Sequence, residues 1–191
     1  MKSKTRSSNA LTTKNILLFG FSFAAVLFII CVILRPESLG HNDGLSYFGA
    51  VWWTLVPYTI AFLVYSACCF IAARKIHSNS SSAKAIKIIL FIMSFALVGL
   101  TLTPHTVIGG LHKVFGSSLF ASQLILSLYL LYKNGMNYKI FILVIIMLVS
   151  GIFSAAFLSS TAGFMIQSQI VYQLAFVVLL SYYLKNISKL R

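Results

Sequence analysis

The stretch TPHTVIGGLH, residues 103–112, places two histidines seven residues apart in a chain that is 59% hydrophobic. Histidine is a general acid or base, a proton carrier and the commonest metal ligand in proteins. If a helix starts directly after Pro104, His105 and His112 differ by about 20° around its axis and by about 10 Å along it. Two histidines at that spacing do not bind one metal ion without further ligands.

The same helical line carries other small and polar residues. Gly109 and Gly116 lie close to it, and Gln123 is 18 residues from His105, a whole number of helical turns. A helix surface that faces lipid does not have this composition. We therefore expect the stripe that includes His112 to face the interior of a helix bundle.

Three interpretations of the histidines remain open. In the first, His105 begins the helix and His112 hydrogen-bonds across the bundle. In the second, His112 meets His41 or Asp43 and forms a His/Asp metal site, for which zinc or iron is the expected ion. In the third, the histidines relay protons or hold a substrate, because ionisable groups within a membrane are costly and usually functional.

Glutamines mark the last apolar segment. Gln169 and Gln173 are four residues apart and so share one face of a helix, and Gln123 and Gln173 lie at similar depth in their segments. We expect these amides to hydrogen-bond across the bundle, chiefly as structural contacts. The complete set of candidate pocket residues is His41, Asp43, His105, His112, Gln123, Gln169 and Gln173.

The elements that position these residues follow from composition. Only 9% of the 191 residues are charged, whereas a soluble domain averages about 25%. Lipid is therefore the expected solvent, and about 20 apolar residues are needed to cross it as a helix. Six such runs occur: 16–34, 50–73, 86–102, 108–132, 138–158 and 163–184. None alternates with period two, so the prediction is an all-α polytopic membrane protein, a six-transmembrane-helix bundle rather than a barrel.

This bundle accounts for nearly the whole chain. We predict a cytoplasmic N-terminal tail over 1–15, a six-helix transmembrane domain over 16–184 and a cytoplasmic C-terminal tail over 185–191. The first run is 19 residues long and ends in ILRPES, without a small-residue cleavage site, which favours an uncleaved anchor over a signal peptide.

The cations are strongly segregated along the chain. Thirteen of the fifteen Lys and Arg residues lie in the tails and in the second and fourth connections, and the other two are Arg35 and Lys113. By the positive-inside rule this predicts that both termini face the cytoplasm, in a multi-pass protein of the inner (cytoplasmic) membrane. The basic face should attract anionic lipids. Nucleic acid is an unfavoured partner, because no basic cluster is interleaved with stacking aromatics on a soluble surface.

Several short motifs together resemble those of the bacterial domain-of-unknown-function 998 family. They are Arg35-Pro36 after the first segment, LSYFG before the second, Pro104 after the third, Gly110-Leu111-His112 at the fourth and Tyr172-Gln173 in the sixth. The resemblance implies a six-helix fold and gives emphasis to His112 and Gln173. It brings no activity with it. The acidic residue that the family often has after the proline is His105 in this chain.

Three functions are compatible with these patterns. The first is an accessory or binding protein whose outward-facing polar pocket holds a lipid headgroup or a small molecule. The second is a membrane-embedded hydrolase that uses a metal held by His112, His41 and Asp43 to activate water against a lipid ester or amide. The third and weakest is a small-molecule transporter, since no paired broken helices are evident. The sequence contains no GxSxG, HExxH, P-loop or CxxC motif.

Overall fold

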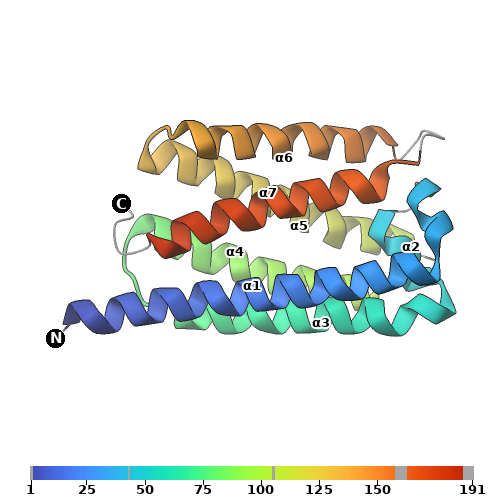
Figure 1. The fold of residues 1–191 in the computed structure, drawn as a ribbon, viewed down its shortest axis with the longest axis horizontal. Helices are drawn as coiled ribbons and strands as arrows, with labels where there is room; N and C mark the ends of the chain where they lie inside the picture. Colours follow the sequence, from blue (N-terminus) through green and yellow to red (C-terminus); the bar gives the residue numbers. More distant parts are fainter. Residues whose placement is uncertain (1, 43, 105, 158–162, 187–191) are drawn as a thin grey trace.

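The structure is a computed structural model that describes residues 2–42, 44–104, 106–157 and 163–186. Six of its helices are long and apolar enough to cross a membrane. They are α1 (Lys2–Leu34), α3 (Trp52–Lys75), α4 (Ser81–Leu102), α5 (Gly109–Asn134), α6 (Tyr138–Phe157) and α7 (Met165–Lys185) (Figure 1). The described residues form no strand. The predicted all-α, six-helix fold of a multi-pass membrane protein is thereby confirmed.

Two helices begin earlier than their apolar runs. Helix α1 reaches back to Lys2, so that most of the predicted N-terminal tail is helical and the helix is about 50 Å long. Its part that is apolar enough to span a membrane is Thr12–Leu34. Helix α4 begins at Ser81 because the Ser80 hydroxyl accepts a hydrogen bond from the Ala83 backbone N–H at 3.2 Å, which is the contact that a serine N-cap makes.

The predicted fourth span, 108–132, agrees with helix α5 to within two residues at each end, but the assumption that the helix starts directly after Pro104 does not hold. Helix α5 begins at Gly109, and Ile108 before it has non-helical backbone angles of φ −130° and ψ 54°. The chain turns at residues 106–108 before the helix begins, and the Ile108 N–H donates to the Pro104 carbonyl at 2.9 Å. Two consecutive glycines are poor helix formers, which favours a start at this point over an earlier one. The geometric relation that we drew between His105 and His112 on one helix therefore does not hold.

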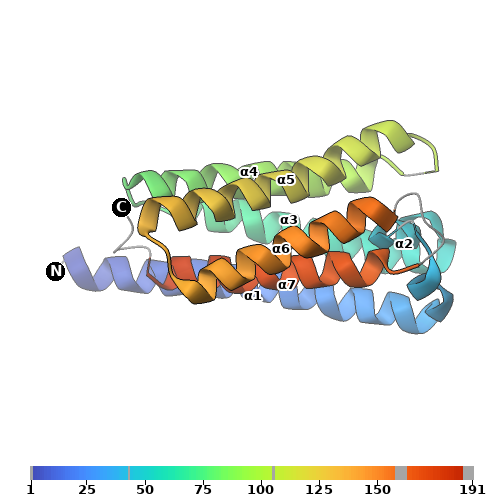
Figure 2. The same cartoon turned by 90° about the horizontal axis from the view of Figure 1, so that it is seen from above.

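The long helices form a closed ring. Each packs against the next in the order α1, α3, α4, α5, α6, α7, and α7 returns to α1. Figure 2 shows them running roughly parallel to one another. The contact between α1 and α3 is close, since a Cβ atom on Gly20 would lie 2.6 Å from the Cβ of Cys68. A small residue such as Gly20 allows two helices to approach closely in lipid.

Both termini lie at one end of the bundle, and the connection between α1 and α3 lies at the other (Figure 1). This connection, residues 35–51, contains η1 (Pro36–Gly40), η2 (Gly44–Ser46) and the short α2 (Tyr47–Ala50). We call it the cap segment. The end that it occupies also carries Lys113, while the helix ends with most of the cations lie opposite. Which end faces the cytoplasm stays a prediction from the charge distribution.

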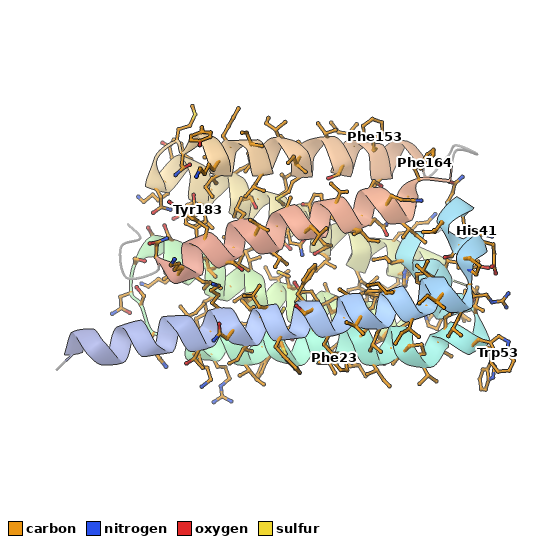
Figure 3. The ribbon with its side chains drawn as sticks, in the orientation of Figure 1. Phe23, His41, Trp53, Phe153, Phe164 and Tyr183 are labelled. Atoms are coloured by element: carbon orange, nitrogen blue, oxygen red, sulfur yellow. The ribbon has the colours of Figure 1, made fainter. Side chains whose placement is uncertain are left out.

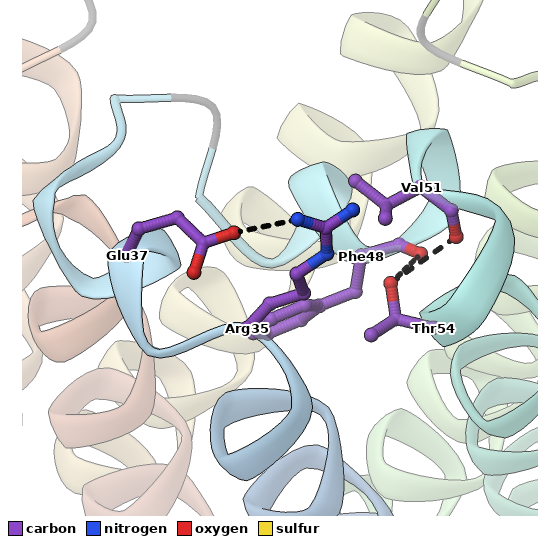
Figure 4. A network of polar contacts seen from close by, with 5 residues as sticks. All are labelled: Arg35, Glu37, Phe48, Val51 and Thr54. Carbon is purple, nitrogen blue, oxygen red and sulfur yellow. Dashed lines mark hydrogen bonds and ion pairs between the residues drawn. The ribbon is translucent and has the colours of Figure 1, made fainter.

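Polar contacts are made within the cap segment and between it and α3 (Figure 4). Arg35 donates to Glu37 at 3.0 Å, and the Thr54 hydroxyl donates to the carbonyls of Phe48 at 2.8 Å and Val51 at 3.2 Å. The pKa of the Glu37 carboxyl is lowered, first by its own backbone N–H and further by the Arg35 guanidinium. The carboxylate therefore stays ionised and offsets the Arg35 charge.

The outer surface is apolar, as a lipid-facing surface must be. Helix α6 exposes Ile142, Val149, Ile152 and Phe153, and each is at least 47% exposed. At the capped end, Trp53 projects away from the start of α3 (Figure 3) and is 71% exposed, which is the place that an interfacial tryptophan takes.

Candidate functional site

A cavity of about 460 Å³ lies within the ring of helices next to the cap segment, and all six long helices contribute to its wall. A volume of this size is typical of small-molecule sites, which combine apolar walls with a few polar groups. Its apolar lining includes Phe21, Phe28, Tyr58, Phe62 and Phe120. Its polar lining includes Ser46, His112, Lys113, Gln169 and Gln173.

The shape of the cavity follows from how α5 and α6 run. Both helices are connected at the end opposite the cap segment, and they separate toward the capped end, where α5 descends behind α7 (Figure 1). Small residues line the wall on each side, namely Gly116 and Ser117 on α5 and Gly151 and Ala155 on α6. Because Ser117 and Ala155 are exposed, the cavity reaches the outer surface of the bundle between these two helices.

His112 is the buried ionisable group of the cavity wall, at 4% exposure. Its Nδ1 atom lies 2.6 Å from the Thr103 carbonyl oxygen, and its Nε2 atom lies 2.7 Å from the Ser46 hydroxyl. A carbonyl oxygen only accepts hydrogen bonds, so Nδ1 carries a proton. In the neutral ring Nε2 is then the acceptor for the Ser46 O–H. The cap segment therefore reaches His112 through Ser46.

Gln169 ties α7 to the same part of the cap segment. Its Oε1 atom accepts a hydrogen bond from the Leu45 backbone N–H at 2.9 Å. Gly44 makes room for this amide, because its φ of +61° and its missing side chain let Gln169 pack where a Cβ atom would be 2.6 Å away. Because the Leu45 N–H donates, the amide atom that accepts it is the oxygen Oε1, and Nε2 is the donor end of the Gln169 amide. This Nε2 atom has no hydrogen-bond partner among the described residues.

The predicted pairing of Gln123 and Gln173 is confirmed. Gln123 Nε2 donates to Gln173 Oε1 at 3.2 Å, and Gln173 Nε2 donates back to Gln123 Oε1 at 3.1 Å. Gln123 is fully buried, as the stripe on α5 predicted. Next to this pair, the Tyr172 hydroxyl donates to the Phe120 carbonyl at 2.6 Å. These contacts join α5 to α7 at the cavity wall, which Phe120 and Gln173 line.

The reciprocal amide pair should show measurable coupling. We expect Gln123→Leu and Gln173→Leu each to lower the free energy of unfolding by about 1 to 2 kcal/mol, because each leaves one amide unpaired. The double variant should cost less than the sum of the two single variants. A double-mutant cycle on the purified protein measures this coupling, and strictly additive effects would contradict the pairing.

No protein-family model matches the chain, and no curated protein or solved structure matches it either.

The resemblance to the domain-of-unknown-function 998 family accordingly stays a prediction. The residues that carried it nevertheless take part in the contacts described above. Ser46 of the LSYFG motif contacts His112, and Tyr172 and Gln173 each bond a residue of α5.

Three further residues were predicted for the pocket, and the structure describes one of them. Asp43 and His105 lie outside the described residues. His41 is exposed at the surface of the cap segment (Figure 3), where its ring stacks on Tyr47 with the ring centroids 4.4 Å apart. It does not line the cavity.

The zinc or iron hypothesis depended on His112, His41 and Asp43. Within the described residues no group of three His, Cys, Asp or Glu side chains is placed to hold a metal ion. Proton donation from Nδ1 to a carbonyl suits a metal-binding histidine, but the Nε2 atom of His112 is already hydrogen-bonded to Ser46. A metal at His112 would have to displace that serine. The metal-dependent hydrolase stays a prediction.

Sequence reasoning missed several polar residues of the cavity, and Ser46 and Lys113 are the two that bear on its chemistry. Ser46 was only part of a motif, and Lys113 was noted only as a cation outside the basic face. Lys113 lines the cavity, is exposed, and makes no ion pair within the described residues. The position of Lys113 in the sequence could have indicated this. It directly follows the buried His112, so it lies about 100° away around the helix, at the edge of the inward stripe.

Proposed function

We propose that the protein binds one amphiphile with an anionic head group, its apolar chain within the cavity and its head group beside the cap segment. The observation that carries the proposal is the division of the cavity lining. Aromatic and aliphatic side chains form most of the lining, whereas the lining residues His112 and Gln169 both hydrogen-bond to the cap segment. Such a lining suits a molecule that has one apolar and one polar end.

The charge of the head group is inferred from the cations at this end. The Arg35 charge is offset by Glu37 at 3.0 Å, whereas Lys113 lines the cavity itself. Among the described residues of the lining, Lys113 carries the charge, and an ammonium group in such a place favours an anion. The amides of Gln169 and Gln173 provide further hydrogen-bond donors for carboxylate or phosphate oxygens.

The opening between α5 and α6 supports a ligand that comes from the bilayer. Exposed residues of both helices line the cavity there, and the surrounding surface is apolar. If the prediction of cytoplasmic termini holds, this opening lies in the outer leaflet, which agrees with the outward-facing pocket proposed from the sequence.

Binding of a fluorescent fatty acid tests the proposal. The full-length protein, in nanodiscs of zwitterionic lipid, is titrated with cis-parinaric acid and with its uncharged methyl ester. We expect saturable binding of the acid. Lys113→Gln should raise the Kd for the acid by roughly three- to tenfold, the effect of one solvated charge pair, and leave the Kd for the ester unchanged.

Two further variants make this result specific. Lys133→Gln removes a cation from the other end of α5 and should not affect either Kd. Gly116→Phe places a ring in the cavity, where a Cβ atom would meet only Leu100 at 3.8 Å, and should abolish binding of both probes. Absence of saturable binding, or equal binding to wild type and Gly116→Phe, would overturn the proposal.

A further inference from the structure

The contact between Ser46 and His112 has the geometry of an activated nucleophile. The Ser46 hydroxyl lies 2.7 Å from Nε2 of His112, and the other ring nitrogen is held by the Thr103 carbonyl at 2.6 Å. A nucleophile within hydrogen-bond reach of a base, and a base oriented by a third group, is the arrangement that defines serine acyl-transfer sites on unrelated folds. Here a backbone carbonyl takes the orienting position.

The three groups come from separate elements, and their meeting depends on the fold. Ser46 ends η2 in the cap segment, Thr103 follows α4, and His112 is in the first turn of α5. Thr103 is fixed in turn, because its hydroxyl donates to the Gly99 carbonyl at 2.7 Å. His112 is buried, which protects the hydrogen bonds of its ring from competition with water.

Both members of the pair line the cavity. The hydroxyl is therefore next to the space in which the proposed amphiphile would lie, and is not enclosed in a packed core. Gln169 also lines this space. It is fixed through Leu45, the residue before Ser46, and presents a free amide N–H₂ end. Side-chain amides are among the donors that stabilise the oxyanion of acyl transfer.

We propose that Ser46 and His112 form a catalytic dyad that hydrolyses an ester bond of the bound amphiphile, with Gln169 as the oxyanion donor. This inference rests on the proposed function, because the cavity must bring the ester to the hydroxyl. The substrate class is an acyl ester whose alcohol part carries the anionic group, so that the acyl chain lies among the aromatic side chains and the head group lies near Lys113.

The reaction balances with water as the co-reactant. Ser46 Oγ attacks the ester carbonyl carbon while His112 Nε2 takes its proton, and the carbonyl oxygen becomes an oxyanion beside Gln169. The bond from carbon to the alkoxy oxygen then breaks, and the proton on Nε2 passes to the departing alcohol. Water attacks the acyl-serine and gives a proton to Nε2, which returns it to Ser46 Oγ as the carboxylic acid leaves.

Covalent labelling of Ser46 tests this inference directly. The purified full-length protein is treated with an alkyl fluorophosphonate, which reacts with activated serines, and the modified peptide is identified by mass spectrometry. We expect stoichiometric labelling at Ser46 and none in Ser46→Ala. His112→Gln should slow labelling by about 100-fold or more, the usual contribution of a general base. Hydrolysis of 4-nitrophenyl decanoate should fall in parallel.

Matched variants separate catalysis from structure. Ser38→Ala removes a buried hydroxyl of the same cap segment that is not part of the cavity lining, and His77→Gln removes an exposed histidine at the other end. Both should label and hydrolyse as wild type does. If Ser46 is not labelled in protein that binds cis-parinaric acid, the pair is a structural hydrogen bond and the inference is wrong. Labelling without binding of the fatty acid would instead overturn the proposed ligand and keep the dyad.

Discussion

Replacing Gly163 by alanine is expected to lower the free energy of unfolding by about 2 to 4 kcal/mol. Gly163 has a φ of +67°, and a Cβ atom on it would lie 2.5 Å from the carbonyl oxygen of Gly40. The left-handed conformation costs an alanine about 1 to 2 kcal/mol. The contact is with backbone, so no change of rotamer relieves it. In a thermal scan of the purified protein this corresponds to a loss of roughly 5 to 15 °C.

The matched control for this variant is Gly40→Ala. It adds a methyl group on the other side of the same contact, but nothing lies within 4 Å of its Cβ position and its φ is not positive. We expect a change of less than about 0.5 kcal/mol. Equal losses for the two variants would show that the two connections do not meet as described.

Gly163 N–H also donates to the Asn42 side chain at 2.9 Å, so Gly163→Ala should loosen the cap segment and weaken ligand binding too.

The second large loss of stability is expected from Gly20→Ala, at the place where α1 packs against α3. The Cβ atom of Gly20→Ala would lie 2.6 Å from Cys68 Cβ and 2.9 Å from its Sγ atom. A Cβ atom is fixed to the backbone, so one of the two helices must shift. Overpacking of this kind costs about 1 to 3 kcal/mol.

Substitutions of Cys68 on α3 test whether contact with its Cβ atom causes the loss of stability in Gly20→Ala. Cys68→Ala keeps the Cβ atom and should not restore stability to Gly20→Ala, whereas Cys68→Gly removes it and should reduce the cost of Gly20→Ala to below about 1 kcal/mol. A double-mutant cycle by thermal or detergent unfolding measures both. Gly110→Ala, at a position with nothing within 4 Å, serves as the neutral control. Failure of Cys68→Gly to reduce the cost would contradict the close approach of the helices.

The spans were predictable because lipid allows few solutions. A chain that lacks charges and cannot leave backbone groups unpaired must cross the bilayer as helices, and the apolar runs therefore gave the positions of α3, α6 and α7 to within a few residues. The Gln123–Gln173 pair was predictable for a related reason. An amide within a span has few partners, and another amide at the same depth is the natural one.

The site itself was only partly predictable. The stripe on α5 correctly placed His112 and Gln123 inward, and the apolar run from 108 located the helix start at Gly109, whereas the assumption of a helix directly after Pro104 did not hold because residues 106–108 turn before the helix. Ser46 escaped prediction because the cap segment folds into short turns, and no periodicity tells which of its side chains points to the cavity.

The separation of α5 from α6 at the capped end has a consequence for how the site is supplied. A ligand that already resides among the lipids reaches the cavity by sideways diffusion and never passes through water. Its occupancy then depends on the mole fraction of that ligand in one leaflet, and changes in the bulk aqueous concentration matter only through that fraction. With the proposed amphiphile as the ligand, dilution of the cells would leave the occupancy of the cavity unchanged, whereas a change in membrane composition would alter it.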